Sequence, residues 1–225
     1  LLPLVRFCQT LGDVTVVVPK VEQSGKSHGI DIHDPFRVHK IALADDITAL
    51  AVESTPADCV RFAILGLEME FDLVISGVNR GYNIGSDILY SGTVSAACEG
   101  VLLGVPAIAL STSFENYENA TKHLSDVFDY INEHKLLDIH NAYNVNIPPN
   151  PKGIKITKQG SPYFSDEFVR QDGDNYMQMG RMIPDVCPDD LTRDTVALES
   201  GYISITPLSN TRTDMEIFER FKSLT

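Results

Sequence analysis

Apolar and polar positions alternate along the chain in short runs, which predict strands and helices in turn. The apolar run Leu73–Ile75 is short enough for a buried strand, and Ser76-Gly77 is expected to end it. The polar, glycine-rich segment 79–87 then predicts a loop, residues 94–104 an alanine-rich helix, and Ile108–Leu110 a second strand. This order is a βαβ unit, and it places the polar loop at the carboxyl end of the first strand, where open α/β sheets bind ligands.

Most of the remaining chain continues this alternation, which predicts an α/β protein. The other predicted elements are a helix over 1–11, a strand over 13–19, a hairpin of 36–41 with 48–53 around an Asp45-Asp46 turn, a helix that begins at Thr55, a helix over 116–134, strands over 143–147, 154–157 and 202–206, and a helix over 214–224. An α/β sheet of this kind normally starts with a strand, whereas this chain starts with a helix and no Met. We therefore expect that its true beginning precedes Leu1.

The last third of the chain changes character. Residues 160–192 are rich in Gly, Pro and Asp, yet aromatic residues recur among them. This pattern favours an extended hairpin arm that packs on a partner subunit, with a mobile lid as the alternative. We predict one domain over 1–225, with an α/β core over 1–158, the arm over 159–200 and a final strand and helix over 201–225.

The polar loop of the βαβ unit offers groups that bind a small anion. It supplies Asn oxygens, Ser and Thr hydroxyls and N–H groups that glycine leaves uncovered, and the helix start near Thr93 adds a favourable dipole. We expect phosphate as the anion, whereas the alternative is a surface loop in which Ser91 only caps the helix. A second polar loop, with Ser24 and Gly25, follows the strand over 13–19. It either converges on the same site or simply connects two elements.

Composition narrows the classes of function. The chain has 225 residues and a net charge of -13, which argues against DNA or RNA as the partner. Its four cysteines form no CxxC pair, which favours reduced thiols in a cytoplasmic protein. No apolar run has membrane-spanning length, and no signal peptide is recognised, so we expect no membrane partner.

The residues from Asp72 to Gly100, DLVISGVNRGYNIGSDILYSGTVSAACEG, resemble the signature of the SurE family of survival proteins. Further blocks agree in order: the Ser-Gly loop after VVVP, STPADCV at 54–60, YNVNIP at 143–148, ITKQG at 156–160 and GYISITPL at 201–208. The resemblance implies a Rossmann-like, three-layer core with a mostly parallel sheet and a C-terminal extension that forms a homodimer or homotetramer. It also implies a metal-dependent nucleotidase that hydrolyses nucleoside 5'- and 3'-monophosphates.

Two groups of site residues follow from the resemblance. Ser24 and Asn79 match two ligands of a single divalent cation, Mg²⁺ or Mn²⁺, in each subunit. The family's other two ligands are adjacent aspartates that have no match here, and we expect them upstream of Leu1, within roughly ten to twenty missing residues that form one strand and its turn. The phosphate-contacting residues match Asn83, Ser91, Gly92 and Thr93.

Of these, Asn83 and Thr93 are the expected catalytic residues, because they would stabilise the charge on the phosphoryl oxygens while metal-activated water attacks. Asn79 and Asn83 could instead only cap loop turns. Two other functions stay open: a nucleotide-binding protein of the same fold without turnover, and a phosphatase that acts on polyphosphate or short oligonucleotides.

Overall fold

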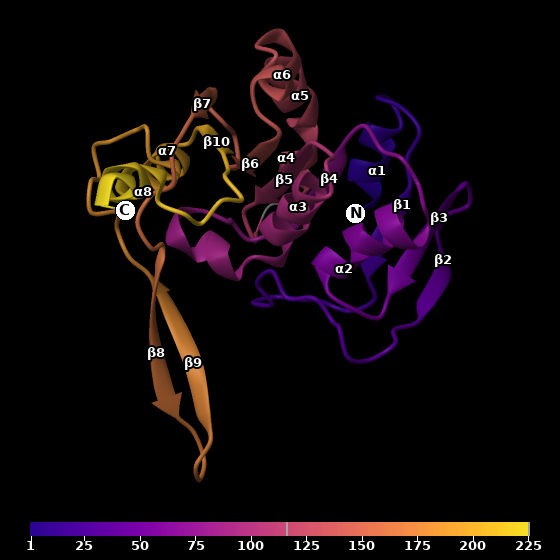
Figure 1. Cartoon of the computed structure of the whole chain (residues 1–225), viewed down its shortest axis with the longest axis horizontal. Helices are drawn as coiled ribbons and strands as arrows, with labels where there is room; N and C mark the ends of the chain where they lie inside the picture. The colour runs from indigo at the N-terminus through magenta and orange to yellow at the C-terminus, as the bar shows by residue number, and fades with distance from the viewer. Residues whose placement is uncertain (116, 225) are drawn as a thin grey trace.

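The computed structural model describes residues 1–115 and 117–224, and Figure 1 shows its arrangement in space. Residue 116, the predicted start of a helix, lies outside the described residues. The strands form two main sheets and a hairpin. The first sheet has the order β1–β3–β2, the second the order β4–β5–β6–β10–β7, and β8 pairs with β9. The strands are β1 (Val16–Pro19), β2 (Val38–Ala44), β3 (Ile47–Val52), β4 (Val74–Arg80), β5 (Ala107–Thr112), β6 (Ala142–Ile147), β7 (Ile154–Ile156), β8 (Phe164–Arg170), β9 (Tyr176–Met182) and β10 (Ile203–Pro207).

Pairing is parallel between β1 and β3, β4 and β5, β5 and β6, and β7 and β10, whereas β2–β3 and β6–β10 are antiparallel. The predicted α/β fold with a mostly parallel sheet is therefore confirmed. The helices are α1 (Leu2–Cys8), α2 (Pro56–Arg61), the π-helical turn η1 (Phe62–Gly66), the 3-10 helix η2 (Gly85–Tyr90), α3 (Gly92–Leu102), α4 (Tyr117–Lys122), α5 (Leu124–Glu133), α6 (Leu136–Ile139), α7 (Asp194–Glu199), α8 (Met215–Phe221) and the 3-10 turn η3 (Lys222–Leu224).

Alternate side chains of β5 divide the core into two layers of packing. Ala107 and Ala109 face α3, where small side chains let the helix approach the sheet closely. Ile108 and Leu110 face the opposite side, where they pack with the apolar stripe of α5 and with Leu4 of α1. Helices therefore cover both faces of the second sheet, and the hairpin β8–β9 projects away from this body (Figure 1).

One slot remains between the two main sheets. In the described part of the chain, β1 pairs only with β3, and β4 pairs only with β5, so each strand keeps one unpaired edge. Both strands line the same cleft, together with apolar side chains of α1 and α2. The first sheet and the second sheet are therefore separate where a continuous sheet would need one more strand.

The structure corrects three expectations about elements. β4 does not end at Ser76-Gly77 but runs on to Arg80, through a shift of register between Ser76 and Asn79. Gly77 has φ +141°, and a Cβ there would lie 2.3 Å from the Leu110 carbonyl oxygen, so this glycine allows a bulge against β5 rather than ending the strand.

The predicted helix over 116–134 is two helices, α4 and α5, which are separated at His123. His123 has φ -100° and ψ 6° and occupies the N-cap position of α5, which begins there as a new helix. The arm predicted over 159–200 is a hairpin only over β8 and β9, and its last part is the helix α7, which is too short to give a clear periodic pattern.

Candidate functional site

All six predicted site residues line one cleft of about 1680 Å³. Ser24 comes from the loop after β1, Asn79 from the end of β4, and Asn83 from the loop that follows β4. Ser91, Gly92 and Thr93 form the start of α3. The two polar loops therefore converge on one cleft at the carboxyl ends of the parallel strands.

A row of polar side chains crosses the second sheet at this end. Asn79 of β4 is in register with Ser111 of β5, Ser111 with Asn146 of β6, and Asn146 with Ser204 of β10. Ser111, Asn146 and Ser204 are fully buried. Residues in register share a face of the sheet, so this row forms a polar floor on the α3 side beneath the loop that carries Asn83.

Two side chains of this row, Ser111 and Asn146, and the buried Asn144 of β6 fix Asn83. Asn146 accepts the Asn83 N–H through Oδ1 at 2.9 Å and donates through Nδ2 to the Asn83 carbonyl oxygen, also at 2.9 Å. Asn144 donates to the same carbonyl oxygen at 2.8 Å, and the Asn83 side-chain Nδ2 donates to Ser111 Oγ at 2.6 Å. With its amide nitrogen turned toward the sheet, the side chain of Asn83 has its Oδ1 as the remaining hydrogen-bonding atom.

Asn79 is oriented in a similar way. Its Nδ2 donates to the Gly81 carbonyl oxygen at 2.8 Å, so the other side-chain atom, Oδ1, is left to accept a donor or a cation. The bond to Gly81 stabilises the turn after β4, which agrees with the alternative in which Asn79 caps a loop turn. This bond uses only the amide nitrogen of Asn79.

The start of α3 supplies N–H donors. Ser91 is the N-cap, and its Oγ accepts the N–H of Val94 at 3.1 Å, as the capping alternative also held. The first helical bond runs from Ser95 N–H to the Ser91 carbonyl oxygen, so the N–H groups of Gly92 and Thr93 come before it and have no acceptor within the helix. A Cβ on Gly92 would lie 2.9 Å from the Pro56 ring, so glycine is needed for α2 and α3 to meet here.

Ser24 lies in an exposed loop at the border of the cleft. Ser24 Oγ donates to Glu22 Oε1 at 2.6 Å, and the Ser27 N–H donates to the Tyr90 carbonyl oxygen at 3.1 Å. The second bond joins this loop to the residue that precedes Ser91. It therefore keeps the two loops side by side.

A buried carboxylate also holds the Ser24 loop against α3. Glu99 of α3 is 4% exposed; its Oε2 lies 2.7 Å from Nε2 of His28, and its Oε1 accepts from Nη1 of Arg61 at 2.7 Å. His28 belongs to the Ser24 loop and Arg61 to α2. Removing Glu99 would therefore free both the loop and the helix that border the cleft.

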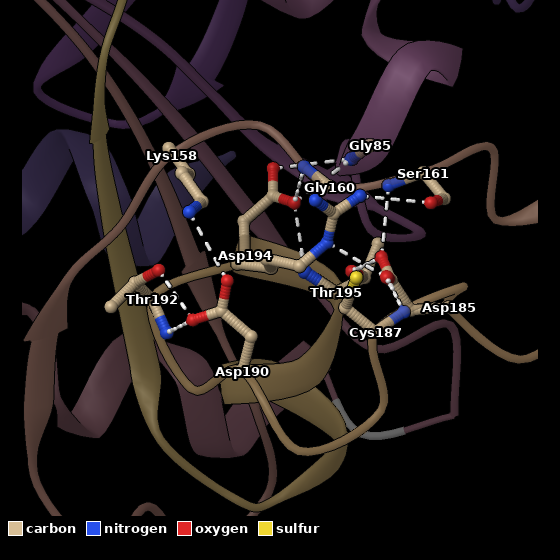
Figure 2. Close-up of polar contacts among 11 residues, drawn as sticks. Gly85, Lys158, Gly160, Ser161, Asp185, Cys187, Asp190, Thr192, Asp194 and Thr195 are labelled. Carbon is tan, nitrogen blue, oxygen red and sulfur yellow. Dashed lines mark hydrogen bonds and ion pairs between the residues drawn. The ribbon is translucent and has the colours of Figure 1, made fainter.

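The C-terminal third borders the cleft through Phe164, the first residue of β8. We call residues 160–164 the root of the arm. There the buried Asp185 accepts from Arg193, Thr195, Ser161 N–H and Cys187 N–H (Figure 2). Burial alone would raise the pKa of Asp185, but these hydrogen bonds outweigh it and hold the pKa well below its ordinary value of 3.8. Asp185 is therefore an ionised, structural carboxylate.

The donors present do not by themselves make a site for a hard divalent cation. Ser24 and Asn79 offer neutral oxygens, and Mg²⁺ or Mn²⁺ require anionic oxygen ligands for firm binding. In the described residues, no group of three His, Cys, Asp or Glu side chains is placed to hold a metal ion. The carboxylate nearest in sequence to the phosphate residues, Asp87, lines the cleft but accepts two backbone N–H groups through Oδ2.

The sequence pattern predicted some of the polar residues of this site but not others. Ser111, Asn144, Asn146 and Asp194 were not predicted, although all four are buried and polar. The NVN sequence of β6 carries a usable signal, since asparagines at alternate positions of an otherwise apolar strand must all face one side. Asp194 gives no such signal, because its partners are distant in the sequence.

Fold and cleft define an α/β protein with a polar site at the carboxyl ends of its parallel strands. Residues 1–166 match the family described as survival protein SurE. The chain is 39% identical over 241 residues to the 5'-nucleotidase SurE of Petrotoga mobilis (99% of this chain, 92% of that protein). It is 41% identical over 214 residues to that of Desulfitobacterium hafniense (90% and 82%). The crystal structure of the SurE protein from Aquifex aeolicus matches with a TM-score of 0.79 and 32% identity (99% and 92%). The chain belongs to the SurE family.

Proposed function

We propose that this protein is a phosphatase that hydrolyses nucleoside monophosphates to nucleoside and phosphate, with 5'-monophosphates as the main substrates and 3'-monophosphates as further ones. The observation that carries the proposal is the convergence of Asn79, Asn83 and the start of α3 on one cleft. The relatives from Petrotoga mobilis and Desulfitobacterium hafniense, which are named 5'-nucleotidases, support the same reaction.

In this proposal each residue has a defined role toward the phosphoryl group. The N–H groups of Gly92 and Thr93 and the Thr93 hydroxyl donate to its oxygens, as does the Ser91 hydroxyl. These fixed donors stabilise the charge that grows on the oxygens as water attacks phosphorus and the nucleoside oxygen leaves. Asn83 orients the phosphoryl group through its Oδ1 by way of a bound water or a substrate hydroxyl.

Aromatic side chains favour a nucleoside as the leaving group. Tyr82, Phe114 and Phe164 line the same cleft and come from three separate segments. Phe114 is 68% exposed, with the Arg80 guanidinium 5.1 Å from its ring centroid, and Phe164 is 42% exposed, so each ring keeps surface that a planar ligand can contact. Base stacking on aromatic rings tolerates different bases, which is compatible with a broad set of nucleotides.

We include metal dependence in the proposal, with the aspartate pair expected before Leu1 as the remaining metal ligands. A strand that precedes α1 would fit between β1 and β4. In the described residues each of these two strands has one unpaired edge, and both line the cleft together with apolar side chains. The carboxyl end of such a strand would lie beside Ser24 and Asn79, and its aspartates would supply the missing anionic ligands. A nucleotide-binding protein of the same fold without turnover is the second candidate, because the N–H groups at the start of α3 would bind a phosphate group whether or not hydrolysis follows.

Assembly and location complete the proposal. Residues of the arm such as Phe168, Tyr176 and Met182 are 61–71% exposed, and a two-stranded hairpin is marginal in water without further packing, so the arm binds a second copy in a homodimer or homotetramer. A cytoplasmic location is supported by the four free cysteines. In the residues that the structure describes, no helix is long and apolar enough to cross a membrane.

The test is phosphate release from nucleoside monophosphates by the full-length gene product, with Mn²⁺, Mg²⁺ or EDTA. Release that EDTA abolishes supports the proposal, and Asn79→Ala should then lower it by about tenfold or more. Nucleotide binding without release under any of these conditions would favour the second candidate. Short oligonucleotides and polyphosphate in the same panel separate the other phosphatase specificities.

A further inference from the structure

A buried carboxylate from the C-terminal third holds the segment that leads to the phosphate residues. Asp194 is 1% exposed, and its Oδ1 accepts the N–H groups of Gly160 at 2.7 Å and Thr195 at 2.8 Å. The N–H of Gly85 donates to Oδ1 at 3.2 Å and Oδ2 at 3.1 Å, across 109 positions of sequence (Figure 2). Gly85 is the first residue of η2, which runs directly into Ser91.

Glycine is required at both distant donors. Gly85 has φ +57°, and a Cβ there would lie 1.9 Å from the Ser161 carbonyl oxygen. A Cβ on Gly160 would lie 2.2 Å from Thr195 Oγ1 and 2.9 Å from Asp194 Oδ1. The two loops can therefore reach one carboxylate only because neither residue carries a side chain.

The contact is reciprocal. Asp87, two residues after Gly85, accepts the N–H groups of Tyr163 and Phe164 at the root of the arm, each at 2.9 Å. Asp194, from the C-terminal third, thus accepts the N–H of Gly85. Asp87, from the segment 83–93, accepts two N–H groups of the arm in return. The two segments interlock through charge-assisted hydrogen bonds, which are stronger than neutral ones.

Asp194 has no cationic partner among the described residues, unlike Asp185, which pairs with Arg193. The pKa of Asp194 is raised above its ordinary value, because burial outweighs the hydrogen bonds from the N–H groups of Gly160, Gly85 and Thr195, which lower it. A buried charge without a counter-ion is costly to maintain, so a purely structural position would be served as well by a neutral acceptor. What the carboxylate adds is a second acceptor oxygen, which Gly85 uses.

We propose that Asp194 is a positioning residue of the site: it fixes the backbone at Gly85 and thereby the placement of residues 83–93 against the substrate phosphate. The inference rests on the proposed function for its effect on catalysis. Its structural half, the ordering of residues 83–93, does not depend on what the site binds.

The test compares Asp194→Asn with Asp185→Asn in the full chain by amide hydrogen exchange and mass spectrometry. The first substitution puts an N–H group opposite the Gly85 N–H, whereas the second disrupts the same C-terminal cluster without touching residues 83–93. In Asp194→Asn we expect exchange across 83–93 to accelerate by about tenfold, the effect of losing a hydrogen bond to a charged group. In Asp185→Asn that segment should exchange at the wild-type rate, and the peptide over α5 serves as the internal reference in both.

Wild-type exchange of 83–93 in Asp194→Asn, or equal acceleration in both variants, would overturn the proposal. If Asp194→Asn does not fold, Asp87→Asn breaks the other half of the lock; acceleration of 83–93 and 160–164 together supports the proposal, and acceleration of neither overturns it. Kinetics give the second measurement, since Asp194→Asn should lower kcat/KM for a nucleoside monophosphate about tenfold while Asp185→Asn retains it. Absence of turnover in the wild type would count against the proposed function, and exchange would still decide the positioning role.

Discussion

Asn146 forms a pair of hydrogen bonds with the backbone of Asn83, accepting its N–H and donating to its carbonyl oxygen, both at 2.9 Å. The two residues are 63 positions apart, and Asn146 is fully buried in the central strand β6. The side-chain amide of Asn146 thus forms the same two hydrogen bonds with Asn83 that a residue of a neighbouring strand would form. The loop after β4 is thereby joined to the sheet through its backbone at Asn83.

Asn146→Leu removes both bonds and keeps the number and branching of the side-chain heavy atoms. The Asn83 N–H then loses its acceptor, so we expect the free energy of unfolding to fall by about 2 kcal/mol. We also expect kcat/KM for a nucleoside monophosphate to fall at least about tenfold, because Asn83 is no longer held in place. Urea denaturation and steady-state kinetics measure the two effects.

Tyr143→Phe is the matched control for Asn146→Leu. Tyr143 lies on the same strand β6, is 4% exposed and packs on the α5 side of the sheet, where its hydroxyl donates to the Leu136 carbonyl oxygen at 2.7 Å. It should lose stability to a similar degree and keep kcat/KM. Equal losses of activity in both variants would mean that stability, and not the position of Asn83, explains the effect.

Thr93→Val keeps the shape of the side chain and deletes only the hydroxyl. If the hydroxyl donates to the phosphoryl group, kcat should fall by about tenfold to a hundredfold, and the inhibition constant of inorganic phosphate should rise. Ser95→Ala is the control within α3, because the Ser95 hydroxyl donates to the Ser91 carbonyl oxygen at 2.7 Å. Unchanged phosphate inhibition in Thr93→Val would leave only the backbone N–H of this residue in the site.

Local chemistry explains what the sequence could predict. The helix predicted to begin at Thr55 has Thr55 as its N-cap, and Asp45-Asp46 forms the predicted turn of the β2–β3 hairpin, because each signal lies within a few residues of the structure that it specifies. Ser91 caps α3, as the alternative to an anion site held. The convergence of the Ser24 and Asn79 loops was only one of two alternatives, because a polar loop after a strand can join a site or simply connect two elements, and the structure has both loops on one cleft.

Long-range contacts explain what the sequence could not predict. Gly77 reads as the end of a strand, and only the carbonyl oxygen of Leu110 on β5 makes it a bulge. The role of Asp194 depends on Gly85 and Gly160, which lie 109 and 34 residues away. Such pairings carry no periodic pattern, so composition and spacing cannot reveal them.

The arm offers a prediction about assembly. Replacing residues 166–180 by a short Gly-Ser turn removes most of β8 and β9 but keeps Ser165 and Arg181, which face each other at the root, and leaves the contacts of Asp87 untouched. If the arm binds a second copy, the shortened protein should sediment as a smaller species. Its melting temperature as a monomer should show little dependence on protein concentration.

Asp174→Ala is the control for this deletion. Asp174 lies at the tip of the hairpin with a fully exposed side chain, so its removal should leave the sedimentation coefficient unchanged. A shortened protein with the mass of the wild-type oligomer would show that the interface lies elsewhere. A smaller species with unchanged exchange over 83–93 would separate two roles of the C-terminal third, because the distal arm would then hold the subunits together while the root alone orders the site.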